Sequence, residues 1–110
     1  MKVWINGTFV DGDDAKVSVF DAGFQHGVGL FETMVAKNGV VFKAHEHMSR
    51  LAESAAMLRL TESLQIEPLV EALNLIIKEN DQESARVRLT LTGGTLHMLQ
   101  RTGVSEGGDP

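Results

Sequence analysis

Two Asn-Gly dipeptides each separate a pair of short runs rich in apolar and β-branched residues. The first dipeptide joins residues 3–5 to 8–10, and the second joins residues 30–37 to 40–43. Asn-Gly readily adopts the positive φ angles of a type I′ turn, whose twist matches that of two antiparallel strands. The sequence therefore predicts two β-hairpins, which restricts the fold to one that contains antiparallel strands.

The rest of the chain adds two helices and two further strands. Residues 85–91 alternate between polar and apolar and predict a strand, and residues 17–21 predict a shorter one. The Gly-rich residues 23–29 predict a loop. A second helix is predicted to begin near Pro68, because proline suits the first turn of a helix. Asn80 and Asp81 are predicted to end it. The first helix begins near Ala44 and is predicted from apolar residues at helical spacing: Met48, Leu51, Ala52, Ala55 and Leu58.

These elements predict an α+β domain, a two-layer sandwich in which an antiparallel sheet carries two helices on one face. Residues 1–92 are predicted to form this domain. Residues 93–110 contain five glycines without a sustained period, and they predict an interdomain loop or a disordered tail. A chain of 110 residues with 43% apolar and 23% charged residues has the composition of one soluble globular domain.

Composition also excludes several classes of function. The chain has no Cys, so it forms neither disulfides nor thiolate metal sites, which suits a cytoplasmic location. A net charge of −5 disfavours a nucleic-acid partner, because phosphate binding needs clustered Lys and Arg. The first residues lack the apolar core of a signal peptide. No apolar run approaches the ~20 residues that span a bilayer, so no membrane association is expected.

The four histidines do not predict a metal site. His45 and His47 are two residues apart at the start of a predicted helix, where positions i and i+2 point in different directions. His26 and His97 lie elsewhere in the chain. Exposed or hydrogen-bonded histidines are therefore the better interpretation for three of the four. His47 differs only because Arg50 follows at i+3 on the same helix face.

Charged residues beside predicted apolar surfaces are the other candidates. Arg50 lies one turn after His47, and spacing alone favours a solvated charge over an anion contact through its guanidinium. Arg86 and Arg88 share one strand face and are either its wet side or a site for an acidic ligand. Glu32 lies inside an apolar strand, where an unpaired carboxylate is costly, so a polar partner is expected.

Taken in order, several segments resemble the N-terminal domain of the class IV, pyridoxal-phosphate-dependent aminotransferases. This family includes branched-chain and D-amino acid aminotransferases and aminodeoxychorismate lyases. The resemblance covers the chain to about residue 94. It is carried by WINGTFV, VSVFDAGFQHGVGLFE, NGVVFKAHEHMSRLAESAAMLRL and ARVRLTLTGG, and most specifically by the H-x-x-R-L element that contains Arg50.

The resemblance implies roles for four residues. Arg50 would hold the phosphate of pyridoxal 5′-phosphate, a role that the bidentate chemistry of a guanidinium suits. His26 and Phe31 would line the substrate pocket, although the family often has tyrosine at the position of His26. Arg88 would assist recognition of a substrate carboxylate or hydrogen bonding in the pocket. The implied substrates are an amino acid or amino-substituted acid and a 2-oxo acid, and the implied assembly is a homodimer.

No lysine of this chain matches the family's catalytic position, because the lysine that forms the Schiff base belongs to the second domain of the family. The resemblance therefore implies a fragment of a larger enzyme that is inactive alone and does not hold the cofactor by itself. The run Phe31-Glu32-Thr33 is closer to lyase-type members than to many branched-chain enzymes. Val35 replaces a basic residue that several branches carry, so the substrate branch stays open.

A second hypothesis comes from the residues without the resemblance. It describes a self-contained, non-enzymatic α+β domain that binds an anionic ligand or a protein partner. Reading the gene beyond codon 110 separates the two hypotheses, because continuation into a domain with a suitable lysine favours the enzyme. The fragment hypothesis also predicts an apolar face that promotes self-association.

Overall fold

The two predicted hairpins form, and they belong to separate sheets. A computed structural model describes residues 1–94 of the chain. Strands β1 (Lys2–Ile5) and β2 (Thr8–Asp11) make a two-stranded antiparallel sheet. Strand β3 (Gly29–Lys37) lies between β4 (Val40–Val41) and β5 (Ala85–Thr92), antiparallel to both. All four residues of the two Asn-Gly turns have positive φ, as type I′ turns require.

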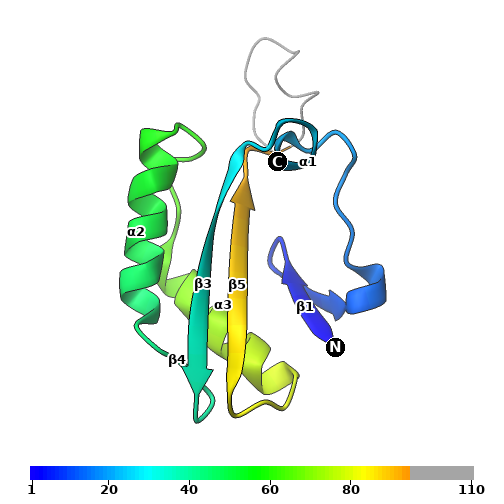
Figure 1. The fold of residues 1–110 in the computed structure, drawn as a ribbon, viewed down its shortest axis with the longest axis vertical. Helices are drawn as coiled ribbons and strands as arrows, with labels where there is room; N and C mark the ends of the chain where they lie inside the picture. Colours follow the sequence, from blue (N-terminus) through cyan, green and yellow to red (C-terminus); the bar gives the residue numbers. More distant parts are fainter. Residues whose placement is uncertain (95–110) are drawn as a thin grey trace.

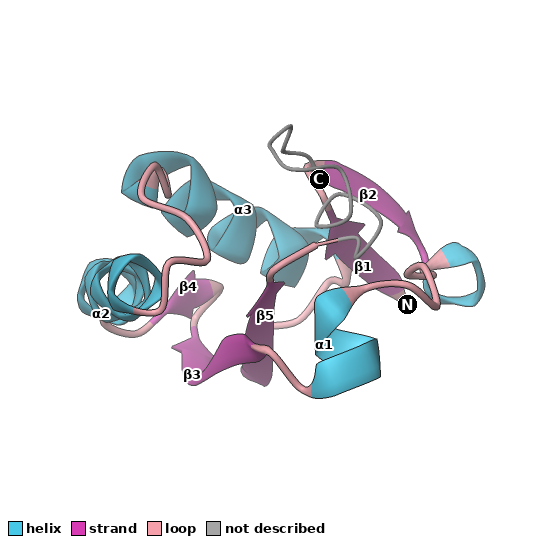
Figure 2. Ribbon diagram, turned by 90° about the horizontal axis from the view of Figure 1, so that it is seen from above, coloured by secondary structure: helices cyan, strands magenta, loops and turns pink. Residues whose placement is uncertain are grey.

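Two long helices cover one face of the three-stranded sheet, and this arrangement confirms the predicted α+β class. Helix α2 (Ala44–Met57) lies beside β3, and α3 (Ile66–Glu79) crosses behind β3 and β5 (Figure 1). The view along the strands in Figure 2 places both helices on the same side of the sheet. Among the described residues, no helix has the length and apolar character needed to cross a membrane.

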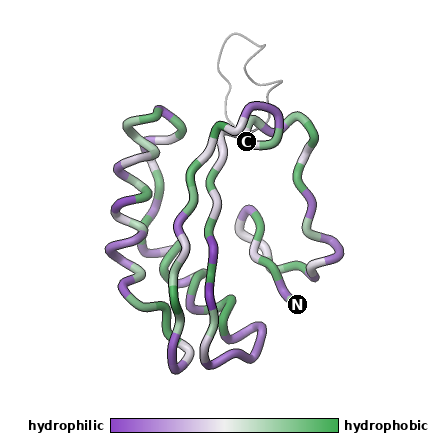
Figure 3. Tube along the Cα trace, in the orientation of Figure 1, coloured by the Kyte–Doolittle hydropathy of each residue, from purple (hydrophilic) through white to green (hydrophobic). Residues whose placement is uncertain are grey.

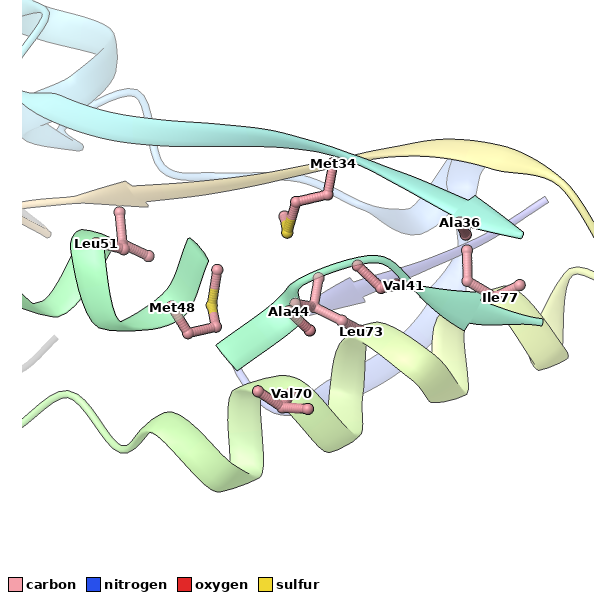
Figure 4. Close-up of a cluster of buried hydrophobic side chains, with 9 residues drawn as sticks. All are labelled: Met34, Ala36, Val41, Ala44, Met48, Leu51, Val70, Leu73 and Ile77. Atoms are coloured by element: carbon pink, nitrogen blue, oxygen red, sulfur yellow. The ribbon is translucent and has the colours of Figure 1, made fainter. Parts of the chain in front are cut away.

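The core lies between this sheet and the two helices. Alternate residues of β3 point toward the helices, and Met34 is only 1% exposed. Figure 3 shows how apolar and polar positions are interleaved along β3 and β5. Figure 4 shows the buried cluster, which draws on every long element of this layer except β5: Met34, Ala36, Val41, Ala44, Met48, Leu51, Val70, Leu73 and Ile77.

Two asparagines of α3 and its C-terminal end connect the helix to neighbouring strands. The Asn74 side chain accepts a hydrogen bond from the backbone of Val41 at 2.9 Å, close to the start of α2. The Asn80 side chain accepts from the Lys2 amide at 2.6 Å and donates to the Lys2 carbonyl at 3.0 Å. Because a side-chain amide pairs with the backbone of β1 in this way, the first hairpin is attached to the end of α3.

The structure differs from the sequence predictions around the Gly-rich segment. Residues 17–20 form no extended strand: within residues 1–94 none of the strands pairs with them, and Val17 and Val19 are mostly exposed. Part of the predicted loop is a short helix, α1 (Ala22–His26). The Asp21 carboxylate caps it by accepting from the amides of Gly23 and Phe24.

The remaining boundaries agree closely with the sequence, with one shortened strand. The strand predicted to Lys43 ends at Val41, because Lys43 adopts a left-handed conformation (φ 55°) immediately before α2. A short 3₁₀ helix, η1 (Gly12–Asp14), occupies the acidic turn after β2. The tail predicted from residue 93 lies outside the described residues except for Gly93 and Gly94, which form neither helix nor strand.

Candidate functional site

Glu32 is the charged residue on the face of β3 that points toward α2. It occupies an alternating position two residues before Met34, and its side chain is only 11% exposed. Two side chains from α2 reach its carboxylate. Arg50 donates through Nε to Oε2 at 3.0 Å and through Nη2 to Oε1 at 2.7 Å. The polar partner expected for Glu32 is therefore a bidentate guanidinium.

His47 provides a third contact with the same carboxylate. Its Nδ1 lies 2.7 Å from Glu32 Oε1, and its side chain is 23% exposed. The Arg50 guanidinium lowers the pKa of Glu32 to about 2, against the opposing effect of burial and with help from His47. Because the ionised carboxylate can only accept, the 2.7 Å contact assigns the proton to His47 Nδ1, and the 3.3 Å approach of Arg50 Nη2 to that nitrogen is then a close contact without a hydrogen bond.

Arg50 combines a fixed position with an accessible charge. Its hydrogen bonds to Glu32 raise the pKa of the guanidinium, while 65% of the side chain remains exposed. Two N–H groups point to Glu32, and the Nη1 group is not used in that pairing. A guanidinium in this state can offer further hydrogen bonds to an anion, such as a phosphate, that approaches from solvent.

Phe31 and Arg88 meet on the opposite face of the sheet. Phe31 is next to Glu32 in β3, so its side chain projects away from the helices, and it is 56% exposed. The Arg88 guanidinium from β5 stacks on the ring, with Cζ 3.9 Å from the ring centroid. This geometry is a cation–π contact. The structure thus brings Phe31 and Arg88 together and leaves Arg50 on the other face.

His26 is the last residue of α1 and is exposed. Its helix is anchored at one end of the sheet, where Thr92 donates a hydrogen bond to Asp21 at 2.7 Å and the Ala22 amide donates to the Gly94 carbonyl at 2.7 Å. Figure 1 shows α1 beside the start of β3 and the end of β5. His26 therefore lies at the same end of the sheet as Phe31, without a hydrogen bond that joins them in the described structure.

The histidines of α2 point to different partners, as their spacing implies. His45 Nε2 lies 2.7 Å from Glu67 at the start of α3, whereas His47 contacts Glu32. Within residues 1–94, no three His, Asp or Glu side chains are grouped closely enough to hold a metal ion.

A cavity of about 850 Å³ lies elsewhere, between the first hairpin, α3 and β5. Apolar residues such as Leu73, Ile76 and Val87 line much of it, and Arg88 is also among its lining residues. Arg50, Glu32 and His47 are not part of its lining. The cluster of charged groups and this apolar cavity are therefore separate features.

The sequence indicated part of this arrangement. The position of Glu32 within an apolar strand signalled that it needs a partner, but it did not identify Glu32 as the residue that joins Arg50 and His47. The i, i+3 spacing of His47 and Arg50 placed these two on one helix face. Their meeting with Glu32 depends on how α2 packs on β3, which is a tertiary feature.

Comparison with known proteins gives a consistent result. The family model described as "Amino-transferase class IV" matches residues 29–104. The "Putative branched-chain-amino-acid aminotransferase" of Methanocaldococcus jannaschii is 43% identical over 94 residues, covering 86% of this chain and 33% of that protein. The D-alanine aminotransferase of Staphylococcus epidermidis is 38% identical over 93 residues, and the match covers 84% of this chain and 33% of that protein.

A solved structure shares the fold. The branched-chain amino acid aminotransferase from Escherichia coli superposes with a TM-score of 0.78 at 35% identity. The match covers 84% of this chain and 33% of that one. The chain spans about a third of the length of the curated relatives that it matches.

Proposed function

Because the chain belongs to the class IV aminotransferase family, we propose that it forms the N-terminal domain of a pyridoxal-phosphate-dependent aminotransferase. In this proposal the domain supplies a contact for the cofactor phosphate and part of the substrate pocket. The observation that carries it is the Arg50 guanidinium, which is oriented by Glu32 and yet 65% exposed.

The residues present fit the phosphate of the cofactor. Phosphate oxygens accept hydrogen bonds from guanidinium N–H groups, and Arg50 has such groups beyond the two that Glu32 accepts. Its neighbours on α2 do not cover the charge, since most of the side chain is exposed. When bound, pyridoxal phosphate supplies the electron-accepting ring for chemistry at the substrate α-carbon.

Phe31, Arg88 and His26 are proposed to shape the substrate pocket. The exposed Phe31 ring offers an apolar surface, and Arg88 holds a positive charge against it that suits a carboxylate. His26 lies at the same end of the sheet on α1. Together they favour an amino acid and a 2-oxo acid as substrates, in agreement with the aminotransferase names of the relatives.

We further propose that the activity requires residues outside this domain and that the enzyme works as a homodimer in the cytoplasm. The chain spans about a third of its relatives. Phe31 and Val35 are exposed apolar residues on the outer face of the sheet, and Phe24 of α1 is exposed as well; a second domain or subunit could cover them.

The proposed phosphate contact is tested by measuring cofactor binding to the intact protein that carries this sequence. Arg50→Gln should weaken binding of pyridoxal 5′-phosphate about a hundredfold in an absorbance titration, because it removes a charge-assisted contact. Arg59→Gln is the control, since Arg59 is another exposed arginine just beyond α2. Equal affinities for the Arg50 variant and the unaltered protein would contradict the proposal.

The proposed inactivity of the isolated domain has a separate test. The 110-residue chain is incubated with pyridoxal phosphate, reduced with borohydride and digested for peptide mapping. Scattered, substoichiometric labelling of lysines without transaminase activity is expected. Stoichiometric labelling of one lysine together with transaminase activity would show that the chain is an enzyme by itself.

A further inference from the structure

Glu32 is a charged residue at a position of β3 where an apolar side chain would suit both the strand and the core. It lies on the helix-facing side of β3, where the neighbouring inward position, Met34, is apolar and buried. Both of its oxygens are engaged, Oε2 by Arg50 and Oε1 by Arg50 and His47. Such a fully engaged carboxylate determines the orientation of the groups that it holds.

Electrostatics alone would disfavour a carboxylate at this place. A negative charge in contact with Arg50 reduces the attraction between that arginine and a phosphate, by Coulomb's law. An arginine on a helix surface also has several rotatable bonds, and a ligand that fixes them loses part of its binding free energy to that ordering. Glu32 removes much of this cost in advance, because two parallel hydrogen bonds fix the plane of the guanidinium.

We propose that Glu32 is a positioning residue for the cofactor phosphate: it holds the Arg50 guanidinium so that Nη1 faces the ligand, and His47 fixes the carboxylate through its Nδ1–H. This inference rests on the proposed function of Arg50. The low pKa of Glu32 agrees with it, because the carboxylate stays ionised and keeps both hydrogen bonds across the neutral range.

Positioning and simple charge attraction predict opposite effects for one substitution. Glu32→Gln removes a negative charge beside Arg50, so charge attraction alone predicts tighter binding of a phosphate. If Glu32 positions Arg50, the same change breaks one of the two parallel bonds and weakens binding. The probes are pyridoxal 5′-phosphate and pyridoxal, which lacks the phosphate, each titrated into the intact protein by absorbance or fluorescence.

The expected result is specific for the phosphate. Glu32→Gln should weaken binding of pyridoxal 5′-phosphate about tenfold and change the affinity for pyridoxal less than about twofold. Glu71→Gln makes the same charge change at an exposed position of α3 and should leave both affinities unchanged. Unchanged or tighter binding of pyridoxal 5′-phosphate to the Glu32 variant would overturn the inference.

Glu32→Asp keeps the test decisive if the glutamine variant does not fold. It retains the charge and shortens the side chain by one methylene, so it cannot maintain both bonds in their present geometry. Positioning predicts a loss of phosphate-dependent affinity, whereas a role of charge alone predicts none. An equal loss for pyridoxal and its phosphate would identify a general structural role and overturn the inference.

The Arg50→Gln titration separates this inference from the function on which it rests. If that variant binds the phosphorylated cofactor normally, the proposed phosphate contact fails, and the inference fails with it. If Arg50→Gln weakens binding while both Glu32 variants bind normally, Arg50 contacts the phosphate without needing Glu32, and only the inference fails. The predicted outcome is that the Arg50 variant and both Glu32 variants lose affinity for pyridoxal 5′-phosphate but not for pyridoxal.

Discussion

The two faces of β3 differ in what they contact, although their residues alternate along one strand. The inner face presents Met34 and Ala36 to α2 and α3, and it also carries Glu32, whose carboxylate is bound by Arg50. The outer face presents Phe31 and Val35, which are 56% and 46% exposed. One strand therefore serves the core with one side and leaves apolar groups available with the other.

This difference shows how a small domain can combine stability with an open site. Burial of apolar area is the main stabilising term in folding, so the inner face holds most of the stabilisation that β3 contributes. The outer face buries less apolar area and therefore contributes less to stability, and Phe31 and Val35 remain exposed on it. Glu32 belongs to the inner face by position and to the site by its contacts with His47 and Arg50.

The largest effect is predicted for the inner face. Met34→Ala should lower the free energy of unfolding by about 2–5 kcal/mol, because it leaves a cavity where a side chain is 1% exposed. Urea denaturation followed by circular dichroism measures the change. A loss below about 1 kcal/mol would mean that the core does not depend on this face of β3.

A smaller effect on the free energy of unfolding is predicted for Glu32, the charged residue of the inner face. Glu32→Gln should lower the free energy of unfolding by roughly 1 kcal/mol at pH 7, because it weakens hydrogen bonds to a charged partner. The same denaturation experiment detects this loss. A more stable variant would show that burial of the carboxylate costs more than its contacts with Arg50 and His47 contribute.

The stability difference between the unaltered protein and Glu32→Gln should also depend on pH. The folded-state pKa of Glu32 is lowered from 4.5 to about 2, chiefly by its hydrogen bonds to Arg50. A lowered pKa contributes stability that is complete above about pH 4.5 and is lost as pH falls toward 2. The difference in unfolding free energy between the unaltered protein and Glu32→Gln should therefore become smaller as the pH falls from about 4.5 to about 2. A difference that stays constant from neutral pH down to about 2 would contradict the shift.

On the outer face, Phe31→Leu should lower the free energy of unfolding by about 0.5–1 kcal/mol. The substitution removes the ring on which Arg88 stacks but keeps an apolar side chain. A double-mutant cycle with Arg88→Gln isolates the contact, and coupling near zero would show that the stacking is not stabilising.

Val35→Thr should have the smallest effect and change the free energy of unfolding by less than about 0.5 kcal/mol. The residue is exposed, and threonine keeps the β-branched shape. Thermal unfolding of the variant provides the measurement. A loss comparable to that of Met34→Ala would remove the distinction between the two faces.

Sequence reasoning recovered the features that depend on local chemistry. The Asn-Gly turns, the alternation along β3 and β5 and the helical spacing of α2 and α3 each follow from nearby residues, and the structure confirms them. The resemblance also led to the family that the comparisons show.

The predictions that were wrong concern segments whose structure depends on distant partners. Val17 and Val19 alternate like a strand, but a strand forms only where a neighbour completes its hydrogen bonds, and no strand of residues 1–94 pairs with them. Helix α1 was not predicted because Gly23 lies within it and Gly27 follows it, although Asp21, directly before its start, is a typical capping signal. The contact of Glu32 with Arg50 spans 18 residues and depends on the packing of α2 against β3.

The roles proposed for His26, Phe31, Arg50 and Arg88 stay predictions, since the structure supplies their positions and the family supplies their interpretation. Phe31 with Arg88 and Arg50 with Glu32 lie on opposite faces of β3. β4 pairs only with Ala36 and Lys37, which leaves the earlier part of that edge of β3 without β4 as a neighbour.

The most direct measurement is a crystal structure of the intact protein with bound pyridoxal 5′-phosphate. We predict a phosphate oxygen within about 3 Å of the Arg50 guanidinium, with the hydrogen bonds from Arg50 to Glu32 retained. A phosphate bound entirely by other residues, with the Arg50 guanidinium directed to solvent, would contradict the proposed role of Arg50.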